Sequence, residues 1–333
     1  MVYTPIWGTG FEMGSKEVVV ASGITGTVAI ETSTKHTGAY ALRIYGATSP
    51  DGVFKIPLDE AQAELYVAAW LNASNDPDAP TWFRFITSDG LYVGLENDAS
   101  KWNAYLNGSL MVAGSVSAPG GTWHLVELYV TVSNSGVLQT KIDGVADIDY
   151  SGDTQPGAGT TIVQVECRQE GSVGHNPNFY VDDITIATGD WIGDVRYDAA
   201  LVPTADTAVK WWEPSTGADN YALLDELPPS DVDYISSGSP GSKDLYEMAD
   251  WTLADPTYEV QFIVDWIRAK KDVAGDQQIR SVIKSGATES SGGSVDLGTV
   301  YQYYGRILTT DPDTAVAWDE AGIDALLGGQ EYL

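Results

Sequence analysis

The stretch TWHLVELYVTVS, residues 122–133, decides the fold class of this 333-residue chain. Its side chains alternate between two sets, of which one holds Trp123, Leu125, Glu127, Tyr129 and Thr131 and the other holds His124, Val126, Leu128, Val130 and Val132. Strict alternation is typical of a β-strand that buries one of its two faces. The second set is the more apolar, so we expect it to face a hydrophobic core.

Similar short, alternating segments recur through the first half of the chain, and no helical pattern lies between them. Several carry Asp-Gly or Asn-Gly pairs, which favour tight hairpin turns: Asp89-Gly90, Asn107-Gly108 and Asp143-Gly144. Strands at this spacing are typical of sandwiches and jelly rolls. We therefore predict an all-β protein that begins with a β-sandwich of jelly-roll type.

The second half has a different composition. After ATGDWIGDV (187–195), which we interpret as a linker, the chain becomes rich in Pro, Ser, Asp and Gly. Strand-like segments then follow at 257–271, 277–286 and 299–310. We predict a jelly-roll domain over residues 1–190 and a second β-rich domain over residues 191–333.

The C-terminal stretch DPDTAVAWDEAGIDALLGGQEYL predicts one short helix. Four apolar residues lie near one face of such a helix: Trp318, Ile323, Leu326 and Leu327. Gly328 and Gly329 follow, and a pair of glycines is a stop signal for a helix.

The charge of the chain is strongly negative, with 47 acids against 17 bases and a net charge of −30. Both halves are acidic, so the charge is not confined to a tail. Such a surface repels phosphate backbones and anionic lipids, which argues against nucleic-acid and membrane-surface partners. No apolar stretch approaches the roughly 20 residues of a membrane span, so we expect no membrane insertion. The start of the chain shows no signal-peptide pattern.

Motifs for catalysis are missing from the sequence. The one cysteine, Cys167, cannot form an internal disulfide, and its strand pattern predicts a core residue. His36, His124 and His175 stand in no metal-ligand spacing. The nearest match to the acid signature of jelly-roll glycoside hydrolases is LENDAS (95–100), which lacks the third acid. We therefore expect that the protein is not an enzyme.

Two acidic groups are candidate calcium sites. Asp182 and Asp183 stand side by side in the strand-like stretch NFYVDDITIATGD, and alternation would turn their side chains to opposite faces. The stretch DIDYSGD places Asp147, Asp149 and Asp153 at the spacing of the first half of an EF-hand loop. No helices flank this second candidate, so a polar turn is the alternative interpretation.

Three motifs occur in order along the first half: GFEMG (10–14), TGAYALRIYG (37–46) and FYVDDITI (179–186). This layout resembles concanavalin A-like and laminin-G-like jelly rolls and related carbohydrate-binding modules. The resemblance implies a structural calcium ion held by Glu12 with Asp182 or Asp183. The alternative is that one aspartate bonds backbone amides or caps a turn while the other is solvated. Beyond possible calcium, no cofactor is expected.

The second half resembles a domain of tailed-bacteriophage virion proteins, through GDVR (193–196), PTAD (203–206), NYALLDE (220–226) and DYISS (233–237). The resemblance implies a non-enzymatic virion structural protein, either a capsid decoration protein or a tail or fibre component, made in the host cytoplasm. Its implied partners are other virion proteins, further copies of the chain in a homo-oligomer, and a cell-surface glycan for adhesion. The alternative function is a carbohydrate-binding module of a glycan-degrading system.

Overall fold

The computed structural model describes residues 3–19, 23–46, 51–75, 80–98, 100–171, 177–253 and 255–333. The chain divides into two compact units. The N-terminal unit consists of Met1–Glu12 and Val19–Tyr197, and the C-terminal unit consists of Met13–Val18 and Asp198–Leu333. The N-terminal unit thus extends a few residues past the predicted boundary at 190, and a short segment near the start of the chain belongs to the C-terminal unit.

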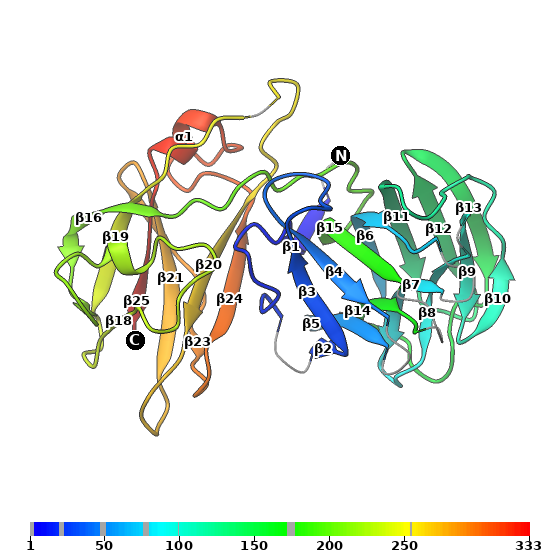
Figure 1. The fold of residues 1–333 in the computed structure, drawn as a ribbon, viewed down its shortest axis with the longest axis horizontal. Coiled ribbons are helices and arrows are strands. Elements are labelled where there is room, and N and C mark those ends of the chain that lie inside the picture. Colours follow the sequence, from blue (N-terminus) through cyan, green and yellow to red (C-terminus); the bar gives the residue numbers. More distant parts are fainter. Residues whose placement is uncertain are drawn as a thin grey trace. The chain divides into compact units, whose positions relative to one another are not determined.

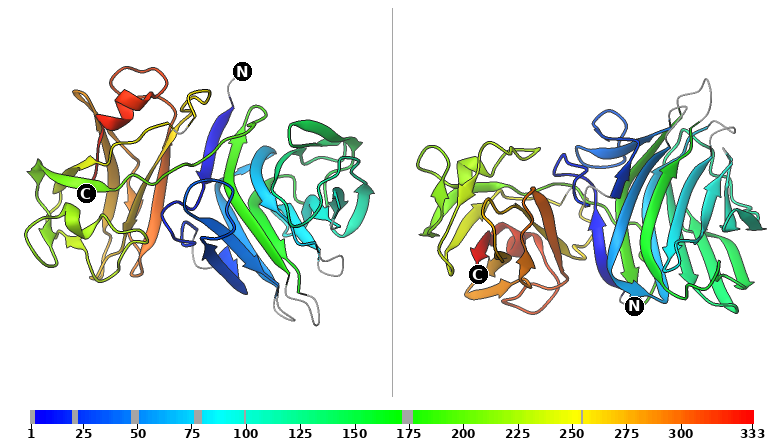
Figure 2. Two further views of the ribbon diagram at one scale, coloured as in Figure 1. Left: turned by 45° about the horizontal axis from the view of Figure 1, so that its top comes forward. Right: turned by 90° about the horizontal axis from the view of Figure 1, so that it is seen from below.

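The N-terminal unit contains two antiparallel sheets (Figures 1 and 2). Sheet A has eight strands among the described residues, in the order β13 (Val145–Gly152), β12 (Gly136–Ile142), β11 (His124–Thr131), β6 (Glu64–Asn72), β15 (Asn178–Thr188), β4 (Ala41–Tyr45) and β3 (Thr27–Glu31), with β1 (Thr4–Thr9) also paired to β15. Sheet B has seven described strands, in the order β10 (Ser109–Val112), β9 (Trp102–Leu106), β8 (Tyr92–Asn97), β7 (Thr81–Thr87), β14 (Ile162–Gln169), β5 (Gly52–Gln62) and β2 (Ile24–Thr25).

Alternating apolar side chains from both sheets form the core between them. Val126, Leu128 and Val130 of β11 are fully buried, which confirms the predicted inward face of that strand. Phe83 of β7 and Cys167 of β14 are fully buried on the facing sheet. The all-β sandwich of jelly-roll type is therefore confirmed.

Two of the predicted hairpin turns have the backbone conformation that their sequence favours. Asn107 and Gly108 have φ values of 45° and 83°, and Asp143 and Gly144 have φ values of 52° and 77°. Positive φ at both central residues is the requirement of the tight hairpin turn that suits twisted strands. These pairs connect β9 to β10 and β12 to β13.

The C-terminal unit is also rich in strands. Its largest sheet, sheet C, has the order β16 (Pro203–Lys210), β19 (Lys243–Met248), β25 (Leu327–Tyr332), β21 (Gln278–Ser285) and β22 (Thr288–Ser291), with β23 (Val295–Asp296) paired to β21. Two separate pairs are β17 (Glu213–Pro214) with β18 (Ile235–Ser236), and β20 (Ile263–Ala269) with β24 (Gln302–Leu308). A short 3-10 helix, η2, spans Tyr221–Leu223.

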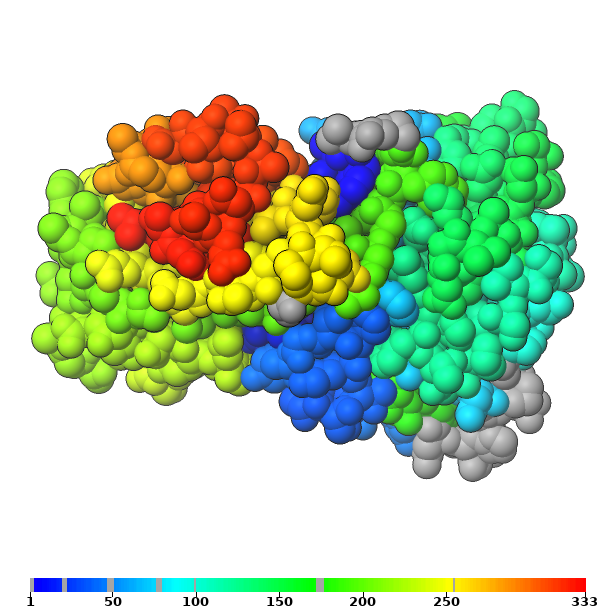
Figure 3. Space-filling model, turned by 90° about the horizontal axis from the view of Figure 1, so that it is seen from above, coloured from blue at the N-terminus to red at the C-terminus, as the bar shows by residue number. Residues whose placement is uncertain are grey.

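The predicted C-terminal helix is confirmed as α1 (Glu320–Asp324), which begins after Asp319, whose carboxylate accepts the Gly322 amide at 2.7 Å. Figure 3 shows the red C-terminal segment beside the yellow segment that precedes β20. The Trp251 amide donates to Asp324 at 2.8 Å. Gly328 and Gly329 do not simply stop the helix but lie within β25. A Cβ at Gly329 would lie 2.0 Å from the Asp244 carbonyl oxygen, so close strand approach requires glycine there. In the described residues, no helix is long and apolar enough to span a membrane.

Candidate functional site

A β-bulge in β15 turns the two adjacent aspartates toward the same loop. The pairing of β15 with β6 shifts register between Asp182 and Thr185, and Asp183 has a φ of 47°. A bulge of this kind breaks the strict alternation of a strand and re-aims its side chains. The prediction that the two side chains face opposite ways is therefore wrong at this position.

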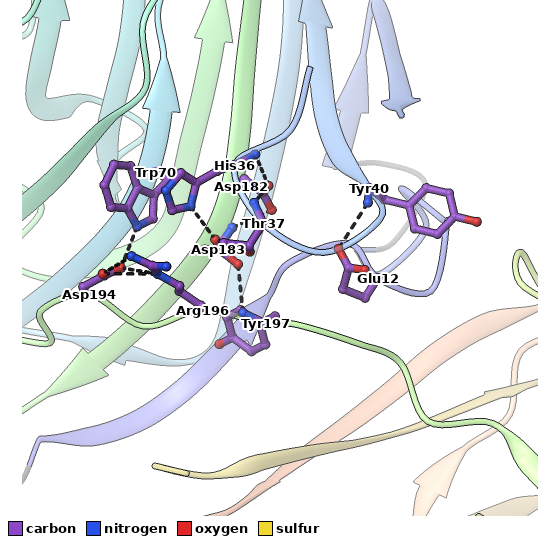
Figure 4. A network of polar contacts seen from close by, with 10 residues as sticks. All are labelled: Glu12, His36, Thr37, Tyr40, Trp70, Asp182, Asp183, Asp194, Arg196 and Tyr197. Atoms are coloured by element: carbon purple, nitrogen blue, oxygen red, sulfur yellow. Dashed lines mark hydrogen bonds and ion pairs between the residues drawn. The ribbon is translucent and has the colours of Figure 1, made fainter. Parts of the chain in front are cut away.

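Both carboxylates accept hydrogen bonds from the His36–Thr37 segment (Figure 4). Asp182 accepts the amides of His36 at 2.9 Å, Thr37 at 3.3 Å and Asp183 at 2.9 Å. Asp183 contacts the His36 ring nitrogen Nδ1 at 3.0 Å and accepts the Thr37 hydroxyl at 2.7 Å and the Tyr197 amide at 2.9 Å. Every oxygen of this pair therefore has a partner within the protein.

Glu12 contacts the same loop one turn further along. Its carboxylate accepts the amides of Ala39 at 2.7 Å and Tyr40 at 3.2 Å. Gly38, with a φ of 53°, lies directly against it, and a Cβ at Gly38 would be 2.3 Å from the carboxyl carbon. Burial raises the pKa of Glu12 to about 7, and the negative charge of Asp183 adds to this rise. Burial and the Asp183 charge also raise the pKa of Asp182.

We call Glu12, His36, Thr37, Asp182, Asp183 and Tyr197 the bulge network. Its amide and hydroxyl donors surround the acids, so the arrangement holds the 36–40 loop against sheet A. Among the described residues, no group of three or more His, Cys, Asp or Glu side chains is placed to hold a metal ion. Calcium at Glu12 stays a prediction, which calorimetry of EDTA-stripped protein checks by whether added calcium raises the melting temperature.

The residues that follow β15 cover the outer face of sheet A. Asp194 accepts the indole N–H of Trp70 at 2.8 Å, and Glu127 accepts the Gly193 amide at 2.9 Å. The Trp191 ring packs at the edges of Tyr66 and Tyr129, with centroid distances of 5.7 and 6.4 Å. Residues 187–195, predicted to be a linker or boundary, are therefore part of the N-terminal fold.

The second acidic candidate lies on a strand and not in a loop. Asp147 and Asp149 belong to β13, and Asp153 follows its end. Asp147 accepts the amides of Ser115 and Val116 at 2.5 and 2.8 Å, and Asp149 accepts the Gln139 side chain at 2.8 Å. Asp153 caps its own turn through the Gln155 amide. Because a strand rises about 3.3 Å per residue, the three carboxylates are spread out instead of gathered.

The outer face of sheet B carries the polar cluster that sequence reasoning missed. Phe83 and Phe85 of β7 are fully buried in the core, so Trp82 and Arg84 point to the opposite face. Arg84 is paired across the sheet with Gly94 and Glu166, Glu166 with Lys55, and Gly94 with Tyr105. We call the side chains of this surface the sheet B face: Lys55, Trp82, Arg84, Tyr92, Glu96, Tyr105 and Glu166.

A buried ion pair lies at the centre of the sheet B face. Arg84 donates to Glu166 from Nε at 2.7 Å and from Nη2 at 2.5 Å, and Lys55 lies 4.0 Å from the second carboxylate oxygen. The Arg84 guanidinium lies over the Tyr92 ring at 4.3 Å from its centroid. A buried ion pair is weak evidence for stability, since desolvation offsets most of its attraction.

Three aromatic rings converge beside this pair. Trp82 meets Tyr92 and Tyr105 edge to face, at centroid distances of 5.6 and 5.3 Å. Gly94 lies between Arg84 and Tyr105, and a Cβ there would lie 2.4 Å from the Cβ of Arg84, so the close approach of β7 and β8 requires glycine. The Trp82 indole N–H is buried and has no acceptor in the described structure. Leaving a buried donor unused costs about 1–3 kcal/mol, so it needs an explanation.

Glu96 lies at the edge of this aromatic cluster, on β8. Burial, followed by repulsion from Glu170 and Asp98, raises its pKa to about 6. No donor in the described part of the chain bonds to it, whereas Asp98 accepts the amides of Ser100 and Lys101. Of the two acids in LENDAS, only Glu96 is thus free to act on a ligand.

The sequence could have indicated the sheet B face through charged residues that stand inside strand-forming stretches. Arg84 interrupts the largely apolar stretch TWFRFIT (81–87), and Glu166 stands between Val165 and Cys167. A charge at such a position is costly unless it is paired. No single motif joins them, because they come from strands separated by many residues and meet only through sheet register.

No family model matches the chain, and no curated protein matches it. Similar solved structures include the carbohydrate esterase vb_24B_21 of the Shiga toxin-encoding bacteriophage phi24B, with 16% identity over 57% of this chain and 100% of that chain and a TM-score of 0.43. An endo-beta-1,4-glucuronan lyase from the fungus Trichoderma reesei has 12% identity over 49% of this chain and 87% of that chain, with a TM-score of 0.40. The catalytic domain of a glycoside hydrolase family 131 protein from Coprinopsis cinerea has 10% identity over 59% of this chain and 100% of that chain, with a TM-score of 0.39.

The expectation of a protein without enzymatic activity is corrected by this comparison, because the similar structures are mostly named as carbohydrate-active enzymes. The expectation relied on a missing sequence motif. That reasoning fails for a sheet face, whose side chains come from alternate positions on separate strands and leave no contiguous motif. At these identities and TM-scores, the similarity assigns no activity to this chain.

The motifs of the C-terminal unit form a buried scaffold for one loop. Asp206 accepts the amides of Asn220 and Tyr221 at 2.9 and 2.8 Å. Asp244, fully buried, accepts the Trp212 amide at 2.9 Å and the Asn220 side chain at 2.6 Å. Asp206 and Asp244 therefore hold this loop in place.

Proposed function

We propose that the N-terminal unit binds a glycan chain on the sheet B face, in the manner of a carbohydrate-binding module. The observation that carries the proposal is the cluster of the Trp82, Tyr92 and Tyr105 rings, in which the buried Trp82 indole N–H has no acceptor among the described residues. Aromatic rings stack on the C–H faces of sugars, and unused polar groups bond their hydroxyls. Both ligand-binding requirements are present on one surface.

The test is affinity for glycans with the full-length protein. A glycan array identifies a ligand, and calorimetry then compares the wild type with Tyr105→Ala. Loss of one stacking ring costs about 1.4 kcal/mol, so affinity falls about tenfold. Tyr180→Ala on sheet A is the matched control and leaves affinity unchanged. Absence of any glycan ligand, or equal affinity of wild type and Tyr105→Ala, rejects the proposal.

Cleavage of the bound glycan is a second candidate function, favoured by Glu96. A carboxyl group whose pKa is raised toward neutrality is a better proton donor to a leaving glycosidic oxygen than an ordinary glutamate, and the pKa of Glu96 is raised to about 6. To test cleavage, the full-length protein is incubated with the glycan that it binds, and new reducing ends are measured. Glu96→Gln abolishes the release but keeps the binding if cleavage occurs here.

We also propose that the C-terminal unit docks on other virion proteins or further copies of the chain. The supporting observation is Trp211, whose side chain is 64% exposed while its amide is held by Asp244. A rigid, exposed aromatic ring suits a protein interface. Labelling intact particles with an antibody against this chain tests the virion location, and light scattering of the pure protein tests self-association.

A further inference from the structure

The charges on and around the sheet B face are unbalanced. In the described structure, the bases on its strands are Lys55 from β5, Arg84 from β7 and Arg168 from β14, and Lys101 precedes β9. Its acids are Glu96 and Glu166 on the strands, with Asp51, Asp98 and Glu170 just beyond strand ends. Acids therefore outnumber bases on a surface that belongs to a strongly acidic chain.

Each base on the strands of this surface already faces a carboxylate of the protein. Arg84 bonds Glu166, and Lys55 lies near the same carboxylate. Arg168 bonds Asp51 and has Glu170 at 3.8 Å from its Nε. No base on these strands is therefore left to neutralise a carboxylate that a ligand would bring.

Glu96 of β8 is the cross-strand partner of Trp82, so it lies at one side of the aromatic cluster. The charges of Glu170 and Asp98 repel its carboxylate, and its own charge raises the pKa values of both Tyr92 and Tyr105. Glu96 thus lies beside the rings that would stack on a sugar. A carboxylated sugar on those rings would meet this negative charge without a compensating cation.

We propose that the sheet B face selects an uncharged glycan and rejects polyuronates, with Glu96 as the residue that sets this preference. This inference rests on the proposed glycan-binding function. The unused groups of the surface fit hydroxyls of a neutral sugar: the Trp82 N–H donates, and the Glu96 carboxylate accepts. The same carboxylate opposes a uronate by charge repulsion.

The experiment is calorimetry of the full-length protein with two sets of hexasaccharides. The neutral set contains β-1,4-glucan, β-1,3-glucan and β-1,4-mannan hexamers, and the acidic set contains β-1,4-linked glucuronate and mannuronate hexamers. We expect the best neutral ligand to bind at least about tenfold more tightly than any uronate at low salt. In Glu96→Gln protein, we expect the ratio of neutral to uronate affinity to fall to about threefold or less. In the wild type, raising the salt concentration to about 0.5 M should also lower this ratio, because salt screens the repulsion.

Asp149→Asn, an acid on sheet A, is the matched control and leaves the preference unchanged. Glu170→Gln provides a second variant in case Glu96→Gln folds poorly, and it moves the preference in the same direction. Tighter binding of uronates by the wild type, or an unchanged preference in folded Glu96→Gln protein, overturns the inference but leaves glycan binding intact. Absence of binding to every hexamer, together with an empty glycan array, overturns both.

Discussion

The bulge network and the sheet B face contain the same kinds of residue, since each combines buried carboxylates with aromatic rings. They differ in how their polar atoms are satisfied. In the bulge network, all four oxygens of Asp182 and Asp183 accept hydrogen bonds from the protein. On the sheet B face, the Trp82 N–H and the Glu96 carboxylate have no partner in the described residues.

This difference separates residues that stabilise the fold from residues that are free to bind. Removing one member of a satisfied network lowers the free energy of unfolding, because its partner groups are left buried and unpaired. Removing a polar group that has no partner in the protein lowers the affinity for a ligand instead. Asp182 and Asp183 are of the first kind, and Glu96 is of the second.

The largest expected effect is loss of stability on replacing Asp183. Asp183→Ala leaves the Tyr197 amide and the Thr37 hydroxyl without their acceptor and places alanine at a positive φ. We expect the free energy of unfolding to fall by about 3 kcal/mol in urea titrations. Asp183→Asn is the control, because asparagine tolerates this φ and keeps an acceptor oxygen, so it loses less. A loss below about 0.5 kcal/mol for Asp183→Ala would contradict a structural role.

Glu12 makes the stability of the N-terminal unit depend on pH. Its pKa is about 7 in the folded protein and 4.5 as its usual value. Between these values the folded state holds a proton that the unfolded state has released, so the contribution of Glu12 to stability falls as pH rises through this window. Glu12→Gln removes that term, and the wild type should lose about 2 kcal/mol relative to it between pH 4.5 and 8. Parallel unfolding curves at the two pH values would be the contrary result.

Trp82→Phe keeps a ring but removes the unused N–H. We expect glycan affinity to fall about fivefold, equivalent to about 1 kcal/mol, measured by calorimetry. Trp123→Phe on sheet A serves as the control for replacing tryptophan away from the site and should keep full affinity. If both variants bind as the wild type does, the sheet B face is no more a binding surface than the bulge network.

The smallest expected effect is at Asp149, on the exposed side of β13. Asp149→Asn removes one exposed contact to Gln139, so the free energy of unfolding should change by less than about 0.5 kcal/mol. Asp147→Ala should cost more, because Asp147 anchors the amides of Ser115 and Val116. Equal effects of the two substitutions in urea titrations would show that hydrogen-bond satisfaction does not predict stability here.

The fold was largely predictable because its determinants are local. Alternation in residues 122–133 and the turns at Asn107-Gly108 and Asp143-Gly144 specify strands and hairpins directly. The strands β19 and β25 were missed, since Asp244, Gly328 and Gly329 mask the usual strand composition.

The candidate site was not predictable for two physical reasons. The bulge at Asp183 reverses a side-chain direction that period-two reasoning takes for granted. The sheet B face depends on register across several strands, which brings Arg84 and Glu166 together although they are far apart in sequence. Neither effect leaves a contiguous pattern.

The segment Met13–Val18 has a consequence for how the protein responds to proteolysis. It belongs to the C-terminal unit, where Glu17 pairs with Arg268 at 2.8 Å, yet it lies within the chain of the N-terminal unit. The backbone therefore passes between the units more than once. A protease cut after Tyr197 yields an N-terminal fragment that still carries a piece of the other unit's fold. Such nicked protein should run as two bands in denaturing gels while eluting as one species from a sizing column.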